Sequence, residues 1–280
     1  MAHSQEEALS LLAEHGDDAK VLAGGQSLVP LLALRLAQPE QLVDISRIDE
    51  LATIANGDGL HIGAVVRQRA VERSEDVARS NPLLAGAVRF IGHAAIRNRG
   101  TVGGSIAHAD PAAELPTVLV ALDGEVELAS TRGTRRVAAA DLFEGFLTTV
   151  LEPDELLTAV HLPSLPAGTG WAFQEFSRRS GDFAIAGVAC TLRVEGGTVA
   201  EARIAMSGMD QTPIRMGAGE DTLVGQAPSA ELWAAAAAAA VTDVQPPSDL
   251  HGTRAYRRQL AGVLIRRALA EAFERAEETA

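Results

Sequence analysis

Two glycine pairs, each close to a short apolar run, constrain this chain more than any other feature of its sequence. The first lies in residues 23–28, Ala-Gly-Gly-Gln-Ser-Leu, and the second in residues 101–105, Thr-Val-Gly-Gly-Ser. Glycine has no Cβ, so it adopts positive φ at little cost and lets the backbone approach another group closely. Consecutive backbone N–H groups in such a turn form a concave anion site. A helix that begins at Ser27 adds its positive N-terminal end to that site.

Each pair also has a simpler interpretation, because tight turns are the commonest use of glycine. The chain has no Walker-type Gly-x-x-x-x-Gly-Lys motif, and no Gly-x-Gly-x-x-Gly motif that opens a helix. It also lacks the Gly-x-Ser-x-Gly elbow of serine hydrolases. From the residues alone, the pairs indicate either two turns or a site for a nucleotide-like ligand.

Hydrophobic periodicity predicts short helices and strands along the whole chain. Helices are expected at residues 6–15, 27–36, 66–79, 82–91, 113–122, 217–224, 230–241 and 253–278. Strands are expected at residues 21–23, 42–45, 51–55, 60–64, 125–129, 156–162, 171–176, 184–194 and 199–206. The second glycine pair is expected in a loop between the helices at 82–91 and 113–122.

Prolines and glycines between Pro163 and Gly170 form the clearest linker in the sequence. It divides the chain into a domain of residues 1–165 and a smaller one of residues 166–280. A strong turn signal at residues 56–59, Asn-Gly-Asp-Gly, divides the first domain into subdomains of about 1–55 and 56–165. The fold class is therefore predicted to be α+β, with a small αβαβ unit at the N-terminus.

The acidic composition argues against several classes of partner. The net charge is −13, whereas nucleic-acid binding needs clustered lysine and arginine. The small group Arg132, Arg135 and Arg136 beside Gly133 predicts a solvated strand end. Residues 1–7 lack an apolar signal core, and the longest apolar run, residues 233–241, is too short for a membrane span. We expect no nucleic-acid partner, no membrane span and a cytoplasmic location.

The only cysteine, Cys190, lies in an apolar run and predicts a buried structural thiol. One cysteine cannot form an intrachain disulfide or supply the usual four thiolates of an iron–sulfur cluster. His108, Asp110 and Glu114 after the second glycine pair allow a metal or acid–base cluster. If a helix begins at Pro111, Asp110 instead caps it, and capping or cofactor contact is the favoured interpretation.

Residues 23–28 together with residues 101–114, Thr-Val-Gly-Gly-Ser-Ile-Ala-His-Ala-Asp-Pro-Ala-Ala-Glu, resemble the FAD-binding medium subunit of the molybdenum hydroxylases. That family includes the flavoprotein subunits of carbon monoxide dehydrogenase and quinoline oxidoreductase and the flavin domain of xanthine dehydrogenase. The resemblance covers nearly the whole chain, including a later Ser-Arg-Arg-Ser-Gly-Asp-Phe segment. It implies a PCMH-type fold of two α+β subdomains that clasp FAD, followed by a smaller C-terminal domain.

The resemblance also implies which residues bind the cofactor. Both glycine motifs are expected to contact the FAD diphosphate and the adjoining ribityl and ribose groups. Ile91 is expected near the flavin ring, on the helix before the second motif, and Leu157 near the cofactor in the strand before the linker. Glu114 takes the place of an aspartate that accepts hydrogen bonds from FAD. The complete implied set is Leu22, Ala23, Gly24, Gly25, Gln26, Ser27, Leu28, Ile91, Thr101, Val102, Gly103, Gly104, Ser105, Ala109, Asp110, Glu114 and Leu157.

This chain departs from the family pattern after the linker, where a lysine is often found. Gln174 and Glu175 occupy that area here. A lysine there would stabilise anionic reduced flavin, so the change bears on the flavin potential and on the choice of acceptor.

The resemblance implies an oxidoreductase subunit that holds FAD as an electron relay and has no catalytic side chain or metal of its own. The implied partners are a large subunit with a molybdenum cofactor and a small subunit with two [2Fe–2S] clusters, assembled as a dimer of heterotrimers. Electrons would leave to an external acceptor. Two alternatives remain: a free-standing FAD-dependent oxidase or reductase, and a flavin-free subunit that serves assembly.

Overall fold

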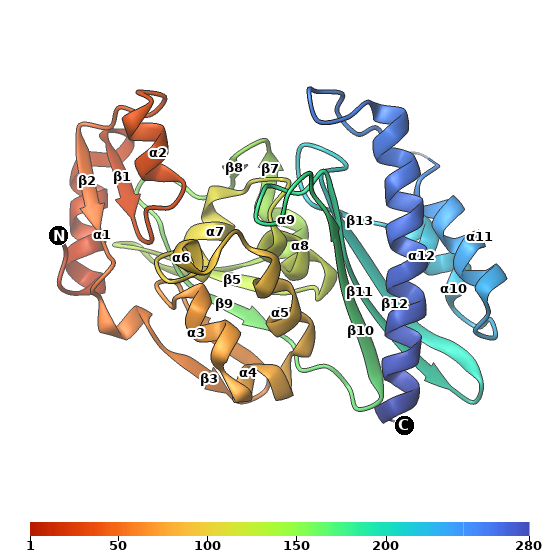
Figure 1. The fold of residues 1–280 in the computed structure, drawn as a ribbon. Coiled ribbons are helices and arrows are strands. Elements are labelled where there is room, and N and C mark those ends of the chain that lie inside the picture. The colour runs from red at the N-terminus through yellow and green to blue at the C-terminus, as the bar shows by residue number, and fades with distance from the viewer. Residues whose placement is uncertain (243, 280) are drawn as a thin grey trace.

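Three units follow one another along the chain in the computed structural model, which describes residues 1–242 and 244–279 (Figure 1). Asp243 and Ala280, which the expected domain of residues 166–280 includes, lie outside the described residues. The N-terminal unit is drawn in red to orange, the middle unit in orange to green, and the C-terminal unit in green to blue.

The N-terminal unit has the αβαβ order that the sequence predicts. Its elements are α1 (Gln5–His15), η1 (Gly16–Asp18), β1 (Ala19–Leu22), α2 (Leu28–Ala33) and β2 (Gln41–Asp44). The Ser4 hydroxyl caps α1 by accepting from the Glu7 N–H at 3.1 Å, and Gly16 ends the helix with a φ of 49°. Strands β1 and β2 pair in parallel, so the residues that follow β1 emerge at the same edge as those that follow β2.

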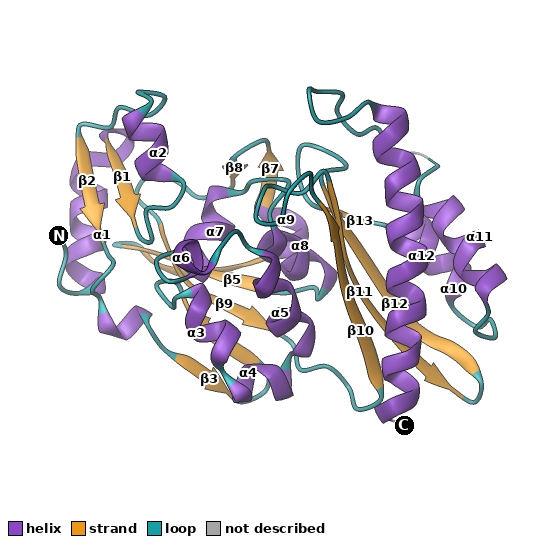
Figure 2. Ribbon diagram, in the orientation of Figure 1, coloured by secondary structure: helices purple, strands orange, loops and turns teal. Residues whose placement is uncertain are grey.

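The middle unit is an antiparallel sheet with helices on one face (Figure 2). Its strands, in the spatial order β3-β4-β9-β5-β6, are β3 (Ile54–Asn56), β4 (Leu60–Gly63), β9 (Leu156–Leu162), β5 (Glu125–Ser130) and β6 (Gly133–Ala138). The helical elements are η2 (Asp49–Leu51), α3 (Gln68–Arg73), α4 (Glu75–Ser80), α5 (Pro82–Ala87), η3 (Val88–Phe90), α6 (Ala94–Arg97), α7 (Val102–His108), α8 (Glu114–Ala121) and α9 (Ala139–Leu142). A small hairpin of β7 (Phe143–Gly145) and β8 (Thr148–Thr149) completes it.

The C-terminal unit is a second antiparallel sheet with three helices. Its elements are β10 (Thr169–Phe176), β11 (Ala186–Glu195), β12 (Thr198–Ser207), β13 (Ile214–Arg215), α10 (Gly217–Leu223), α11 (Ala230–Ala240) and α12 (Arg254–Thr279). Alternate residues of the strands point to opposite faces. Ala172, Cys190 and Ile204 join the core under the helices, whereas Phe173 and Ala189 join the core of the middle unit. The sheet therefore lies between α12 on one side and α5 and α8 on the other, as Figure 1 shows.

Three expectations about elements are wrong. The helix expected at 66–79 is two helices, because Ser74 is extended and caps α4 by accepting from the Val77 N–H at 3.2 Å. The helix expected at 82–91 ends at Ala87 and continues only as the 3-10 turn η3. The stretch from β6 to β8 was not predicted, because β6 is largely exposed and charged and has no apolar alternation. Arg135 and Arg136, expected at a solvated strand end, are exposed but lie within β6, and Arg135 pairs with Glu155 at 2.7 Å.

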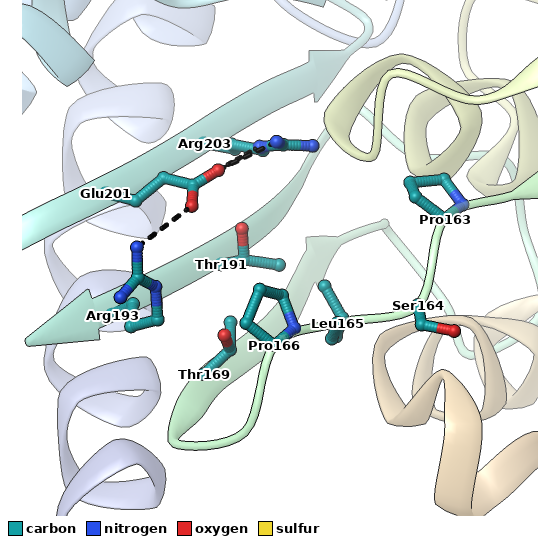
Figure 3. Close-up of a pocket in the computed structure, with 9 residues that line it drawn as sticks. All are labelled: Pro163, Ser164, Leu165, Pro166, Thr169, Thr191, Arg193, Glu201 and Arg203. Carbon is teal, nitrogen blue, oxygen red and sulfur yellow. Dashed lines mark hydrogen bonds and ion pairs between the residues drawn. The ribbon is translucent and has the colours of Figure 1, made fainter. Parts of the chain in front are cut away.

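The linker expected at 163–170 is a loop up to Gly168, after which β10 begins. Figure 3 shows a small pocket beside it, lined by the linker and by strands of the C-terminal sheet. Glu201 there lies 2.7 Å from the Arg203 guanidinium and 3.7 Å from that of Arg193. None of the predicted cofactor residues lines this pocket, so we place the functional site elsewhere.

Cys190 is fully buried, which confirms the structural thiol, and burial raises its pKa well above the usual thiol value. Across residues 1–242 and 244–279, no helix has both the length and the apolar character that crossing a bilayer requires.

Candidate cofactor site

The two glycine motifs lie side by side, although they are far apart in sequence. A Cβ on Gly24 would lie 2.5 Å from the Arg99 carbonyl oxygen and 2.8 Å from the Gly100 Cα. A Cβ on Gly104 would lie 3.6 Å from the Ala23 Cβ. The first motif therefore packs directly on the chain that leads into the second, and a side chain at Gly24 would force them apart.

The first motif presents a row of unused backbone donors. It connects β1 to α2, turns at Gly25 with a φ of 74°, and has Ser27 as the N-cap residue of α2. Within the described residues, none of the five N–H groups from Gly24 to Leu28 donates a hydrogen bond. The Ser27 hydroxyl makes no capping bond either. Buried or half-buried N–H groups are nearly always paired, so an unpaired row indicates a place for an acceptor.

The second motif is not the open loop that we expected. It forms the first turn of α7, where the Thr101 hydroxyl accepts from the Gly104 N–H at 3.1 Å. The N–H groups of Val102 and Gly103 donate to carbonyl oxygens at 3.0 Å, and that of Ser105 to the Thr101 carbonyl at 3.2 Å. These amides are already paired, so the expectation of a second open anion turn is wrong.

Close packing explains why the second motif has a glycine at position 103. A Cβ on Gly103 would lie 2.6 Å from the Ala64 Cβ and 2.7 Å from its Cα. Gly103 therefore lets α7 approach the end of β4, a close contact between two parts of the chain. Gly104 and Ser105 are the partly exposed members of the motif, and Gly104 faces the first motif at Ala23.

A half-buried arginine beside the two motifs was missed in the sequence. The Arg67 guanidinium donates to the carbonyl oxygens of Arg99 and, at 3.5 Å, of Ser46. Burial lowers its pKa, as does the nearby charge of Arg99. No carboxylate lies within 4.0 Å of it among the residues that the structure describes. An isolated antiparallel β-bridge between Arg67 and Thr101 positions the arginine beside the second motif. The two residues are far apart in the sequence, so no local pattern predicts their pairing.

Two apolar candidates lie in the core next to these motifs. Ile91 is 9% exposed and Leu157 is 3% exposed, and both belong to the core of the middle unit. Ile91 follows η3 and is extended, so it does not lie on a helix as expected. Its carbonyl accepts from the Arg97 guanidinium at 2.8 Å, which holds this turn in place.

The segment between α7 and α8 differs from its expected geometry. Ala109 ends α7 in the left-handed region with a φ of 53°. Asp110 does not cap a helix, because α8 begins at Glu114 rather than at Pro111. Its carboxylate instead accepts from the Ala112 N–H at 2.8 Å and forms a turn of the kind that aspartate favours. No group of three metal-ligating side chains occurs within residues 1–242 and 244–279.

Glu114 begins α8 and is half-buried. Burial raises its pKa to about 7, and the charge of Asp110 acts in the same direction. A hydrogen bond from its own backbone N–H and the charge of Arg97 oppose that rise. His108 nearby has a lowered pKa, mainly because of burial.

Gln174 and Glu175 point to opposite faces of β10. The Gln174 amide donates to Glu271 of α12, away from the middle unit. Glu175 points toward the middle unit, where burial and then the charge of Glu114 raise its pKa to about 8. Of the two residues, only Glu175 therefore lies on the face toward the middle unit.

Comparisons with known proteins agree with this geometry. Residues 1–165 match the family model described as the FAD binding domain in molybdopterin dehydrogenase, and residues 171–272 match the CO dehydrogenase flavoprotein C-terminal domain. The chain is 45% identical to the 6-hydroxypseudooxynicotine dehydrogenase complex subunit alpha of Paenarthrobacter nicotinovorans, over 100% of this chain and 95% of that protein. It is 40% identical to the carbon monoxide dehydrogenase medium chain of Hydrogenophaga pseudoflava, over 96% and 94%.

Solved structures give the same result. A carbon monoxide dehydrogenase chain from Hydrogenophaga pseudoflava superposes with a TM-score of 0.95 at 41% identity, covering 98% of this chain and 96% of that one. Quinoline 2-oxidoreductase from Pseudomonas putida 86 gives a TM-score of 0.94 at 38% identity, with 98% and 96% covered. The α+β fold with an FAD-binding domain and a smaller C-terminal domain is thereby confirmed, as are FAD as the cofactor and the class of oxidoreductase flavoprotein subunit. The chain belongs to the family of FAD-binding medium subunits of the molybdenum hydroxylases.

Proposed function

We propose that this chain is the electron-transfer subunit of a heterotrimeric molybdenum hydroxylase. In this proposal a small subunit passes electrons from its [2Fe–2S] clusters to the FAD held here, and an external acceptor takes them up. A large subunit with a molybdenum cofactor oxidises the organic substrate. The support comes from relatives that are named medium chains or FAD-binding subunits of dehydrogenases, and from coverage of nearly their full length.

The row of unpaired N–H groups from Gly24 to Leu28 is the observation that carries the proposal. A diphosphate offers acceptor oxygens and negative charge, which suit consecutive backbone donors. The Ser27 hydroxyl adds a donor, and Arg67 adds a positive charge without a carboxylate partner within 4.0 Å among the described residues. These features fit the diphosphate of FAD, and bound FAD supplies the redox chemistry.

The remaining candidates take different roles in this proposal. We assign Gly104, Ser105 and Asp110 to the side of the site formed by the second motif, and Glu114 to the junction with the C-terminal sheet. Ile91 and Leu157 support the site as apolar neighbours in the core. We place the boundary between the FAD-binding domain, residues 1–165, and the C-terminal domain, residues 166–280, in the linker after β9.

The expected assembly is a dimer of heterotrimers in the cytoplasm. No side chain of this chain is assigned an acid, base or nucleophilic role, because its residues bind and orient the cofactor while the substrate reacts on a partner. The proposal therefore predicts that the isolated chain binds FAD but does not oxidise an organic substrate.

Purification of the tagged chain from its native host tests the proposal. We expect a visible flavin spectrum, together with two further polypeptides in equal ratio, one carrying molybdenum and one carrying iron. A chain that runs alone and oxidises a substrate with its own flavin would make it a free-standing oxidase or reductase. A colourless chain that co-purifies with partners but takes up no added FAD would make it an assembly subunit.

A further inference from the structure

Glu175 lies in a row of three residues that cross the C-terminal sheet on the face toward the middle unit. Glu175 of β10 is opposite Gly187 of β11, which is opposite Ser207 of β12. Phe173, two residues before Glu175, packs into the core of the middle unit from the same face. A Cβ on Gly187 would lie 2.5 Å from the Ser207 hydroxyl and 3.8 Å from the Glu175 Cγ. The glycine therefore leaves the space that these two side chains share.

The end of this row is joined to the chain that leads into α8. The Gly208 N–H, one residue after Ser207, donates to the Pro111 carbonyl at 2.8 Å. Glu114 begins α8 three residues later, and its charge acts on Glu175. Two carboxyl groups from different units therefore interact electrostatically at the junction between the middle unit and the C-terminal sheet.

Two polar side-chain atoms at this junction lack partners. The Glu175 Oε2 and the Ser207 hydroxyl are both buried, and neither has a hydrogen-bond partner among the described residues. Within residues 1–242 and 244–279, neither Glu114 nor Glu175 forms an ion pair. A buried carboxylate without a partner is costly, and a second carboxylate beside it raises that cost.

The charges around the pair favour a bound proton. Glu175 experiences the charge of Glu114, and Glu114 experiences those of Asp110 and Arg97. Arg97, whose positive charge acts on Glu114, itself donates to both carboxylate oxygens of Glu72 at 2.8 and 3.2 Å. Burial and the neighbouring carboxyl raise the pKa of Glu175 to about 8, so the group is largely protonated at neutral pH. A protonated carboxyl group is a hydrogen-bond donor.

We propose that Glu175 is a carboxylic acid that donates a hydrogen bond to the bound flavin, and that Glu114 holds it in this form. This inference rests on the proposed function, because it requires FAD in the site beside Glu114. In this proposal Glu175 presents a proton donor without a fixed positive charge. The interaction is consequently present below the pKa of Glu175 and is lost as the pH rises through it.

Measurement of the FAD dissociation constant against pH, by quenching of flavin fluorescence, tests the inference on the full chain. For the wild type we expect Kd to rise about tenfold between about pH 6 and about pH 9, because one donor becomes a buried charge. Glu175→Gln keeps a donor that does not titrate, and its Kd should stay within about twofold over this range. Glu175→Ala should bind weakly at both pH values. Glu201→Gln, a carboxylate removed from the same sheet beside Arg203, is the control and should follow the wild type.

Infrared spectra of the FAD-free chain provide an independent measurement. The C=O band of a protonated carboxyl group should be present near neutral pH, disappear as the pH rises, and be absent from Glu175→Gln. The inference is overturned if that band is absent from the wild type, or if wild type and Glu175→Gln show the same pH dependence of Kd. Failure of the proposed function looks different, because the wild type and Glu201→Gln would then bind no FAD at any pH.

Discussion

At the scale of single residues, the glycines of the two motifs have different tasks. Gly24 and Gly103 let two stretches of chain approach closely, whereas Gly25 supplies a left-handed turn that aligns the free N–H groups. All of them look alike in the sequence. The sequence therefore identifies the two motifs as the candidate cofactor site, but not which glycines face a ligand and which face the chain.

Substitution of Gly25 by alanine separates these tasks. Alanine at its φ of 74° costs about 1 kcal/mol of stability and turns the N–H row away from the diphosphate. We expect Kd for FAD to rise about tenfold, measured by fluorescence titration. Gly16→Ala is a matched control, because Gly16 is also left-handed at 49° but ends α1, with no atom within 4 Å of an added Cβ. Equal FAD affinity of the two variants would refute the role given to the first motif.

At the scale of elements, burial decided which predictions succeeded. The strands near 125–129, 156–162 and 184–194 are apolar and were predicted close to their observed bounds. The exposed strand β6 was missed because its side chains are stabilised by ion pairs such as Arg135–Glu155, which no local periodicity encodes. Similarly, Arg67 was missed because its contacts with Arg99 and Thr101 depend on tertiary structure.

Strand β10 packs closely on α12, and Gly170 permits this contact. A Cβ on Gly170 would lie 1.7 Å from the Ala272 carbonyl oxygen, so the helix would have to move. We expect Gly170→Ala to lower the free energy of unfolding by ~3 kcal/mol. Gly262→Ala, in α12 with open space around it, should instead raise it by up to about 1 kcal/mol. Urea unfolding of both variants measures the difference, and a neutral Gly170→Ala would show that α12 is not packed on β10 as described.

At the scale of the whole molecule, two sets of carboxyl groups give stability a pH dependence with opposite signs. The guanidinium groups of Arg97 and Arg69 lower the pKa of Glu72 to about 2. The contribution of ionised Glu72 to the free energy of unfolding is therefore present above pH 4.5, the usual pKa of glutamate, and is lost as the pH falls toward the lowered pKa. The raised pKa of Glu175, about 8, means that its folded form favours the proton, so its contribution is lost as the pH rises above 4.5.

We therefore expect the free energy of unfolding of the FAD-free chain to be highest on the acid side of neutrality. Glu72→Gln should lower it by about 3 kcal/mol near pH 6, because the buried Arg97 loses its partner, and should flatten the acid limb. Glu175→Gln should reduce the pH dependence of the free energy of unfolding between about pH 5 and about pH 8. Partial solvent access limits this effect to about 2 kcal/mol. Urea titrations across this range provide the measurement, and an acid limb that is unchanged in Glu72→Gln would contradict this assignment.

The C-terminal sheet contributes to two cores at once, and this has a consequence for how the cofactor enters. Phe173 of β10 lies 5.1 Å from Phe90 between ring centroids, and Asp123 lies 2.5 Å from Arg215. The sequence predicts a linker between Pro163 and Gly170, yet apolar and ionic contacts join the middle unit to the C-terminal unit. Separation of the middle and C-terminal units would expose the core of the middle unit to water. The linker thus joins two units that are already packed on each other, and we expect FAD to enter without a separation of the middle and C-terminal units.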